Sequence, residues 1–381
     1  MTCNGQKTNN CQDFDKLKSH KVIAFGEASH GSYSDYKARI ELIKCLIKNG
    51  DTISVLIEMP HATGIAIQKY YSGEIDEDSL IKEARYYGLR TNAFLELINE
   101  FKGNEQVSFQ GFDMQLQQST LVYLKESIKA IKPNLEISPM IDSLNQNFLF
   151  DYSDSLYLSY LPVISRNLNL LKSTLTKEGL LVNKNFLTIQ YPLQIVEQHF
   201  HMLVYAKPLQ NFKYVVYRDS CMAENVILLN HYLGKQSIVL AANSHVMLTT
   251  QSNFVMMGGH LKQYYEDDYF IIVSQYKKGK LLVSENVEGQ RVIIEKNFTA
   301  YKTSIPSKLN KLLPYEHDTL LLISQESGRI KRLFSRKRLG YDMGAGFGNN
   351  KKSGLIYFYP ANFDAVYYIP NVLPSIYMSK E

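Results

Sequence analysis

Two glutamates and two histidines in this chain follow short apolar runs that are typical of buried β-strands. They are Glu27 and His30 after the first run, Glu58 after the second and His245 after a third. A single amphipathic helical segment separates the first two runs, residues 22–25 and 53–57, which predicts a βαβ unit in a parallel sheet. Because open parallel sheets bind ligands outside the carboxyl ends of their strands, these four side chains define one candidate site.

These residue types suit hydrolysis by activated water. A neutral imidazole takes a proton from water near neutral pH, and a carboxylate bound to it fixes its tautomer. A second imidazole or an arginine stabilises the oxyanion of a tetrahedral intermediate. Histidine and glutamate are also acceptable ligands for a divalent metal, so a metal-dependent hydrolase is the alternative. The nearby arginines favour a site without metal or other cofactor, because their charge competes with a cation for the carboxylates.

Two arginines lie on apolar helix faces. Arg39 is on the buried side of the helix after the first strand, and Arg218 is on the apolar stripe of the segment 217–233, directly before Asp219. A buried guanidinium cannot lose its proton and therefore needs an acidic or hydrogen-bonding partner. We expect Arg39 to pair with the strand-end glutamates. Asp113 ends a further strand and is either a supporting site residue or a helix cap.

Several other mechanisms lack their sequence signals. The chain contains no GxSxG, HExxH or Walker A sequence. The glycine-rich stretch GAGFG at 344–348 lies between two expected strands and does not open a helix, so it is not predicted to bind phosphate. The basic run RIKRLFSRKR at 329–338 is expected to be a solvated surface segment.

The 381 residues are predicted to form one α/β domain with a parallel-rich central sheet flanked by helices. Residues 1–18 read as a polar, poorly ordered leader, and residues 19–381 as the domain. Within the domain, about 115–210 is helical throughout and is expected to be an insertion that forms one wall of the active-site cleft. A small-molecule substrate suits such a pocket, whereas the net charge of +5 does not indicate nucleic acid as a partner. The oligomeric state stays open.

Cysteine spacing and hydropathy indicate the cellular compartment in which the protein is expected. The four cysteines are Cys3, Cys11, Cys45 and Cys221. They form no CxxC pair and no metal-finger spacing, which fits a reducing compartment better than a disulfide scaffold. No apolar run is long enough to span a membrane, and no signal peptide begins the chain. A cytoplasmic protein is therefore expected, and the alternative is a lipoprotein whose signal has been removed before the early cysteine.

Taken in order, these motifs resemble those of the erythromycin esterase family. GEASHG at 26–31 is similar to its signature, and Glu58 in IEMP, 28 residues after His30, is similar to its second acid. FQGFDMQ, RDSCMAEN and NSHV resemble three further family segments, and FDAVYYI resembles its C-terminal strand. The resemblance covers roughly residues 20 to 370. One departure is Ala242, where family members often carry a histidine before the asparagine.

The resemblance implies hydrolysis of the macrolactone ester of 14-membered macrolides such as erythromycin, and hence antibiotic resistance. It would make His30 the general base, Glu27 and Glu58 its acidic partners, Arg39 their charge partner and His245 the second imidazole. Asp113, Arg218, Asp219 and Asn243 would bind substrate or support the site. Cleavage of another lactone or ester, or ligand binding without turnover, remain the alternatives.

Overall fold

The computed structural model describes residues 11–84, 86–148, 157–205, 213–249, 254–313, 316–346, 348 and 352–378. The chain forms two compact units. The first contains residues 1–58, 66–110 and 233–381, and the second contains residues 59–65 and 111–232. The strands and every residue of the histidine–carboxylate cluster described below belong to the first unit, apart from the ends of two strands at the boundary.

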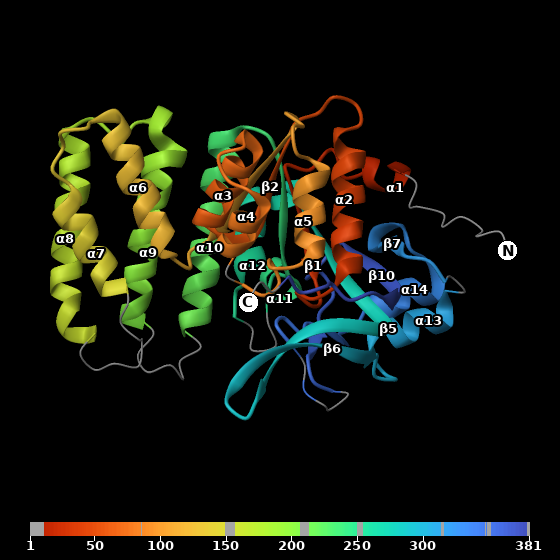
Figure 1. The fold of residues 1–381 in the computed structure, drawn as a ribbon. Helices are drawn as coiled ribbons and strands as arrows, with labels where there is room; N and C mark the ends of the chain where they lie inside the picture. Colours follow the sequence, from red (N-terminus) through yellow and green to blue (C-terminus); the bar gives the residue numbers. More distant parts are fainter. Residues whose placement is uncertain are drawn as a thin grey trace. The chain divides into compact units, whose positions relative to one another are not determined.

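A mostly parallel sheet forms the core of the first unit (Figure 1). In the described residues its strand order is β3-β2-β4-β1-β5-β10-β7, and β6 pairs with β5. The strands are β1 (Val22–Glu27), β2 (Ile53–Pro60), β3 (Val107–Asp113), β4 (Gln236–Ala242), β5 (Tyr269–Val287), β6 (Gln290–Thr299), β7 (Thr319–Leu322) and β10 (Ala365–Val372). A separate ribbon joins β8 (Arg338–Tyr341) to β9 (Leu355–Phe358). The predicted α/β fold with a parallel-rich sheet is confirmed.

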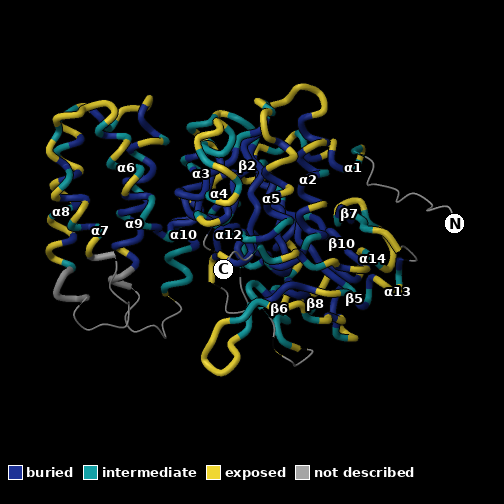
Figure 2. The backbone as a smooth tube through the Cα atoms, in the orientation of Figure 1, coloured by how far each residue is buried: buried dark blue, intermediate teal, exposed yellow. Residues whose placement is uncertain are grey.

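Burial explains why the central strands are continuously apolar. All six residues of β1 are buried, and it pairs in parallel with β4 on one side and β5 on the other. Parallel strands covered on both faces need apolar side chains at every position. Figure 2 shows this sheet as the buried centre of the unit. Because β1, β2 and β4 run in one direction, their carboxyl ends lie at one edge.

Helices cover this sheet in the first unit. They are α1 (Cys11–Asp15), α2 (Tyr33–Ile47), α4 (Glu77–Glu83), α5 (Asn92–Glu100), α11 (Asn243–Val246), α12 (Met257–Tyr265), α13 (Ile305–Leu312) and α14 (Gly328–Phe334). α3 (His61–Ser72) crosses from one unit to the other. Ser32 caps α2 by accepting a hydrogen bond from the Asp35 amide, which fixes where the helix begins after the site loop.

The second unit is helical. Its helices are α6 (Gln118–Ile131), α7 (Ser138–Phe148), α8 (Tyr157–Lys177), α9 (Tyr191–Tyr205) and α10 (Lys213–Leu233). α7 packs on α6 and α8, and α6 also packs on α9 (Figure 1). The helical insertion expected at about 115–210 falls in this unit, which continues through α10. Its role as a wall of the active-site cleft stays a prediction.

The segment before β1 differs from the expected leader. Residues 11–15 form α1, and Phe14 and Leu17 are fully or almost fully buried. Cys11 forms a disulfide with Cys45 of α2, 34 residues away, which the cysteine spacing had not indicated. The pairing depends on α1 packing against α2, and short-range motifs carry no signal for it. Residues 1–10, the rest of the expected leader, lie outside the described residues.

This disulfide removes the argument for a reducing compartment, because protein disulfides persist mainly in oxidising ones. In the described part of the chain, no helix is both long and apolar enough to cross a membrane.

The disulfide should contribute measurably to stability. Replacing both Cys11 and Cys45 by serine is expected to lower the free energy of unfolding by about 2–4 kcal/mol, because the cross-link restricts the unfolded chain. Urea unfolding of wild type and variant measures the difference. A thiol reductant should destabilise wild type to the same extent and leave the variant unchanged. Coincident unfolding curves for oxidised wild type and variant would contradict the expectation.

Candidate active site

A buried carboxylate joins an imidazole and a guanidinium at the end of β1. His30 Nδ1 lies 2.6 Å from Glu27 Oε1, and Arg39 Nη1 donates to Glu27 Oε2 at 2.5 Å. The Glu27 and Arg39 side chains are 8% and 3% exposed, whereas the His30 side chain is 29% exposed. Glu27 and Arg39 are therefore buried within the network, whereas solvent can reach the His30 imidazole. The predicted pairing of Arg39 with a strand-end glutamate is confirmed.

The loop between β1 and α2 sets the position of His30. The Ala28 amide donates to Ser274 Oγ of β5 at 2.9 Å, and the His30 amide donates to the Gly344 carbonyl at 3.0 Å. Gly31 passes so close to β5 that an added Cβ would lie 1.8 Å from the Leu282 carbonyl oxygen. Only glycine fits there, which accounts for the glycine that follows the histidine.

Arg39 ties the carboxylate to the sheet. Besides Glu27, its Nη2 donates to the Phe25 carbonyl at 3.2 Å and to the Ala241 carbonyl at 3.3 Å. Burial lowers the pKa of Arg39, but the combined electrostatic effects of Glu27, Tyr36, Asp35 and Tyr276 outweigh it, and the pKa is raised. The guanidinium thus stays charged and links the ends of β1 and β4.

A second imidazole–carboxylate pair lies at the ends of β2 and β4. His245 Nε2 is 3.4 Å from Glu58 Oε1, and the Ala242 amide donates to Glu58 Oε2 at 3.0 Å. β4 lies between β1 and β2 in the sheet, so residues far apart in sequence meet at this edge. The backbone amide of Ala242 thus orients the second carboxylate.

The two pairs act on one another electrostatically. Burial lowers the pKa of His30, but the Glu27 hydrogen bond and the charges of Glu27, Glu58 and Asp342 outweigh it. The pKa of His30 is therefore raised above its ordinary value of 6.5. If His30 is the base, only its neutral form acts, so activity should rise as the pH increases through this raised pKa.

Glu27→Gln tests that electrostatic coupling. Removing the negative charge should lower the His30 pKa and move the acidic limb of the pH profile of kcat/KM to lower pH. The maximum rate should fall as well, because the amide holds the imidazole tautomer less firmly. Measuring kcat/KM between acidic and neutral pH for both proteins checks this. An acidic limb at the same pH in both would show that Glu27 does not set the pKa of the base.

Asp342 is a site residue that sequence reasoning missed. Its Oδ1 accepts from the Ser244 amide at 3.4 Å, and its charge acts on both His30 and His245. Burial raises the pKa of Asp342, while Ser244 and the two histidines oppose that rise. Its one sequence signal is that it directly follows the short strand β8, much as Glu27 ends β1 and Glu58 lies two residues before the end of β2.

The glycine-rich stretch 344–348 also contributes to the site, although not as a phosphate loop. The Gly344 backbone bridges to Ser29, and a Cβ added at Gly344 would lie 3.9 Å from His30 Nε2. Tyr87 donates to the Ala345 carbonyl at 2.7 Å, and its ring lies edge-on to the His30 ring at 6.4 Å. The structure thus surrounds the exposed imidazole with backbone and one aromatic ring.

Asp35 is another buried carboxyl group that the sequence did not single out. It accepts a hydrogen bond from the Tyr276 hydroxyl. Burial raises the pKa of Asp35 to about 7, and the neighbouring Arg39 charge opposes this rise. Asp35 therefore belongs to the charge environment of Arg39 and can be neutral or ionised near neutral pH.

The four supporting residues fall in two places. In the first unit, Asn243 donates to the Ser274 and Tyr341 carbonyls, both at 3.0 Å, so its amide joins β5 to β8. In the second unit, Arg218 donates to Asp113 through two bonds of 3.1 and 2.8 Å. Asp219 is completely buried. Arg218, which is half-buried, thus has an acidic partner. Roles in substrate binding stay predictions for all four.

Histidine and glutamate side chains can also coordinate a metal ion. Among the described residues, no group of three or more histidine, cysteine, aspartate or glutamate side chains is arranged to hold a metal ion. Hydrogen bonds and ion pairs within the protein account for both oxygens of Glu27 and of Glu58.

The fold and this edge define an α/β protein with two imidazole–carboxylate pairs at the ends of parallel strands. Its sequence matches the family described as erythromycin esterase over residues 54–372, and the chain belongs to that family. The matched range includes Glu58 and His245, whereas Glu27, His30 and Arg39 precede it.

Solved structures share the fold. A Bacillus cereus protein is 19% identical with a TM-score of 0.79, covering 100% of this chain and 96% of its own. A succinoglycan biosynthesis protein is 16% identical with a TM-score of 0.75, over 97% and 92% of the two chains. A histidine-to-asparagine variant of the erythromycin esterase EreC, in its open conformation, is 16% identical with a TM-score of 0.72, over 98% and 97%. No curated protein matches the sequence.

Proposed function

We propose that this protein hydrolyses the macrolactone ester of 14-membered macrolides such as erythromycin and so confers macrolide resistance. The observation that carries the proposal is the Glu27–His30 pair, in which a buried carboxylate holds a half-buried imidazole that solvent can reach. Family membership and the structural similarity to EreC support the ester as substrate.

His30 is the general base in this proposal. When Nδ1–H donates to Glu27, Nε2 carries the lone pair and can accept a proton from water. The resulting hydroxide attacks the ester carbonyl carbon and forms a tetrahedral oxyanion. Collapse of that intermediate breaks the bond to the ring oxygen, which takes the proton from His30 Nε2. The product is an open chain with one carboxylate and one new hydroxyl group.

In this proposal His245 assists as the second imidazole. Its Nε2 lies 3.4 Å from Glu58 Oε1, and an imidazole N–H at this edge of the sheet would stabilise an oxyanion by donating a hydrogen bond to it. Because its imidazole is mostly buried, a charge there acts through a medium that screens it less than water does.

We further propose that the reaction needs no metal. Both Glu27 oxygens have protein partners, and one partner is the Arg39 cation. A metal ion would have to displace that guanidinium from a buried carboxylate. The occupied carboxylates support activation of water by the imidazole instead.

Mass spectrometry of erythromycin incubated with the purified protein tests the function. We expect the drug to gain one water, at the same rate with and without a metal chelator. Heat-denatured protein provides the control for spontaneous ring opening. Loss of activity in chelator and its recovery on adding metal would refute the metal-free route. An unchanged drug would refute the assignment of erythromycin as a substrate. A panel of other lactones and esters would then show whether the site hydrolyses any ester.

A further inference from the structure

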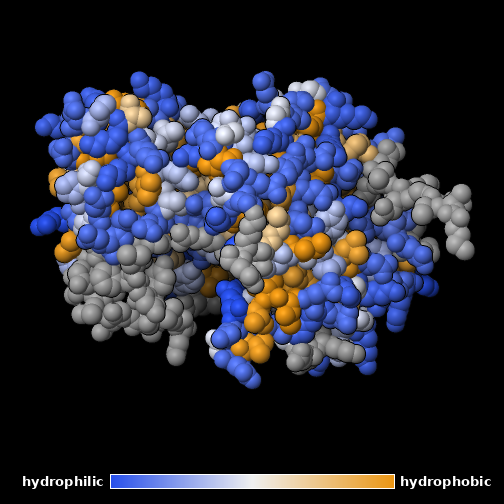
Figure 3. Space-filling model, in the orientation of Figure 1, coloured by the Kyte–Doolittle hydropathy of each residue, from blue (hydrophilic) through white to orange (hydrophobic). Residues whose placement is uncertain are grey.

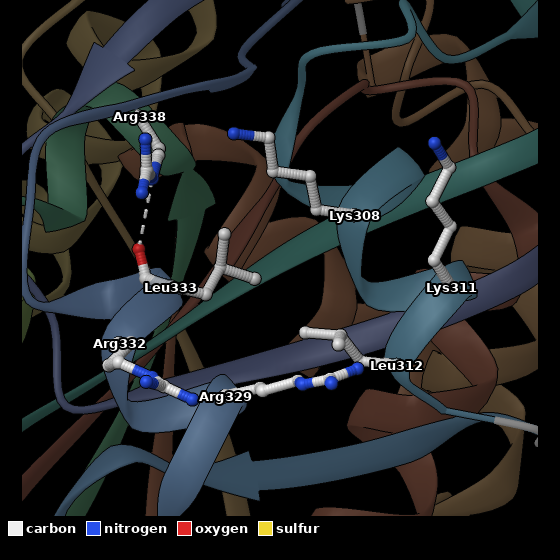
Figure 4. Close-up of a pocket in the computed structure, with 7 residues that line it drawn as sticks. All are labelled: Lys308, Lys311, Leu312, Arg329, Arg332, Leu333 and Arg338. Carbon is white, nitrogen blue, oxygen red and sulfur yellow. Dashed lines mark hydrogen bonds between the residues drawn. The ribbon is translucent and has the colours of Figure 1, made fainter.

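A surface hollow in the first unit is lined mostly by cations. This hollow has a volume of about 320 Å³ and lies between α13, α14 and the start of β8 (Figure 4). The lining residues are Lys308, Lys311, Leu312, Arg329, Arg332, Leu333 and Arg338. We call it the basic pocket. Five of its seven residues are positively charged and none is acidic.

The two helices present the same pattern to this pocket. Lys308, Lys311 and Leu312 share one face of α13 at spacings i, i+3 and i+4. Arg329, Arg332 and Leu333 repeat that spacing on α14, which packs against α13. Figure 4 shows the cationic side chains extending from both helices around one space. The tertiary structure brings the two helices together, since residues 313–327 lie between them in the sequence.

Among the described residues, no carboxylate neutralises these cations. In the part of the chain that the structure describes, none of the five has a carboxylate within ion-pair distance. Arg338 instead donates to the Leu333 carbonyl at 3.2 Å, which directs its guanidinium (Figure 4). Lys308 and Arg338 are half-buried, and the other three cations are exposed. Burial lowers the pKa of Lys308, and the charges of Arg338 and Lys311 lower it further.

This concentration of charge is local. The whole chain carries a formal net charge of only +5. The five cations in this hollow, which have no acidic partner among the described residues, are therefore a local excess of positive charge and not part of a uniformly basic surface. The surface over α13 and α14 is hydrophilic on the side shown in Figure 3. Like charges held together destabilise a protein unless an anion binds between them.

We propose that the basic pocket binds a small molecule that carries a polyphosphate group. Arginine forks and lysine ammonium groups are the side chains that suit phosphate oxygens, and five of them match more than one phosphate. The volume is enough for a small ligand. Leu312 and Leu333 add apolar surface for an organic part of the ligand. The assignment is independent of ester hydrolysis.

Calorimetric titration of the full chain with ATP, ADP, AMP and inorganic tripolyphosphate tests the proposal. We expect saturable binding at one site per chain for the compounds with two or more phosphates, weaker binding of AMP, and loss of affinity as salt increases. Tighter binding of ATP than of tripolyphosphate would identify an organic ligand that contacts the leucines. Equal affinities for ATP and tripolyphosphate would show that the pocket recognises the polyphosphate group alone.

Matched variants locate the site. Lys308→Gln with Arg338→Gln removes the two half-buried cations, and Lys311→Gln with Arg332→Gln removes two exposed ones if the first pair impairs folding. Each pair should weaken binding at least about ten-fold, because each removes two charge-assisted contacts. The control, Lys331→Gln with Arg336→Gln, removes the same charges from exposed positions outside the pocket lining.

Three results would overturn the assignment. They are no saturable binding of any of the four compounds, AMP binding as tightly as ATP, and equal loss of affinity in the control variant. Binding of duplex DNA or of phosphatidylglycerol vesicles without binding of tripolyphosphate would likewise show a diffuse basic surface rather than a pocket for a small anion.

Discussion

His30→Ala should reduce kcat for ester hydrolysis by about 10²- to 10⁴-fold, the range that general-base catalysis supplies. The imidazole is the one member of the Glu27 network with substantial solvent access, at 29% of its side chain. Its removal leaves Arg39 to balance the Glu27 charge, so the fold should persist. Steady-state kinetics on the macrolide, together with thermal unfolding, separates loss of catalysis from loss of structure.

The matched control is His201→Ala, which removes an exposed imidazole from α9 of the second unit. It should retain wild-type activity. His30→Asn should be as inactive as His30→Ala, since its amide can bind Glu27 but cannot take a proton from water. Full hydrolysis by a folded His30→Ala protein would refute the general-base assignment and with it the proposed mechanism.

Arg39→Met should lower the free energy of unfolding by roughly 3–5 kcal/mol, the usual result of removing one partner of a buried ion pair. The Arg39 and Glu27 side chains are 3% and 8% exposed, so water cannot replace the missing guanidinium. The variant also loses the bonds to the Phe25 and Ala241 carbonyls, which stabilise the ends of two strands. Urea unfolding at neutral pH measures the loss.

A double variant distinguishes the charge from the packing. Glu27→Gln combined with Arg39→Met removes both charges, so it should unfold at a higher urea concentration than Arg39→Met alone. If the double variant is instead less stable than Arg39→Met, the lost carbonyl bonds and packing dominate, and the ion-pair explanation fails. Its activity should be low in either case, because Glu27 no longer carries the charge that orients His30.

Local sequence determined the first half of the site. The apolar run of β1, the turn after it and the amphipathic pattern of α2 placed Glu27, His30 and Arg39 within 13 residues of one another. Strand and helix periodicities are short-range properties, so a buried arginine on α2 and a carboxylate at the end of β1 could be predicted to meet. The parallel sheet and the common edge of β1 and β2 followed from the same patterns.

Tertiary structure alone decided the rest. His245 meets Glu58 because β4 inserts between β1 and β2, and strand order is not encoded in local periodicity. Asp342 and Gly344 join His30 from more than 300 residues away, through a ribbon outside the main sheet. The Cys11–Cys45 disulfide and the basic pocket depend on helix packing in the same way. Side-chain types and spacing thus indicated the chemistry of the His30 network, whereas contacts between distant segments determined which further groups surround it.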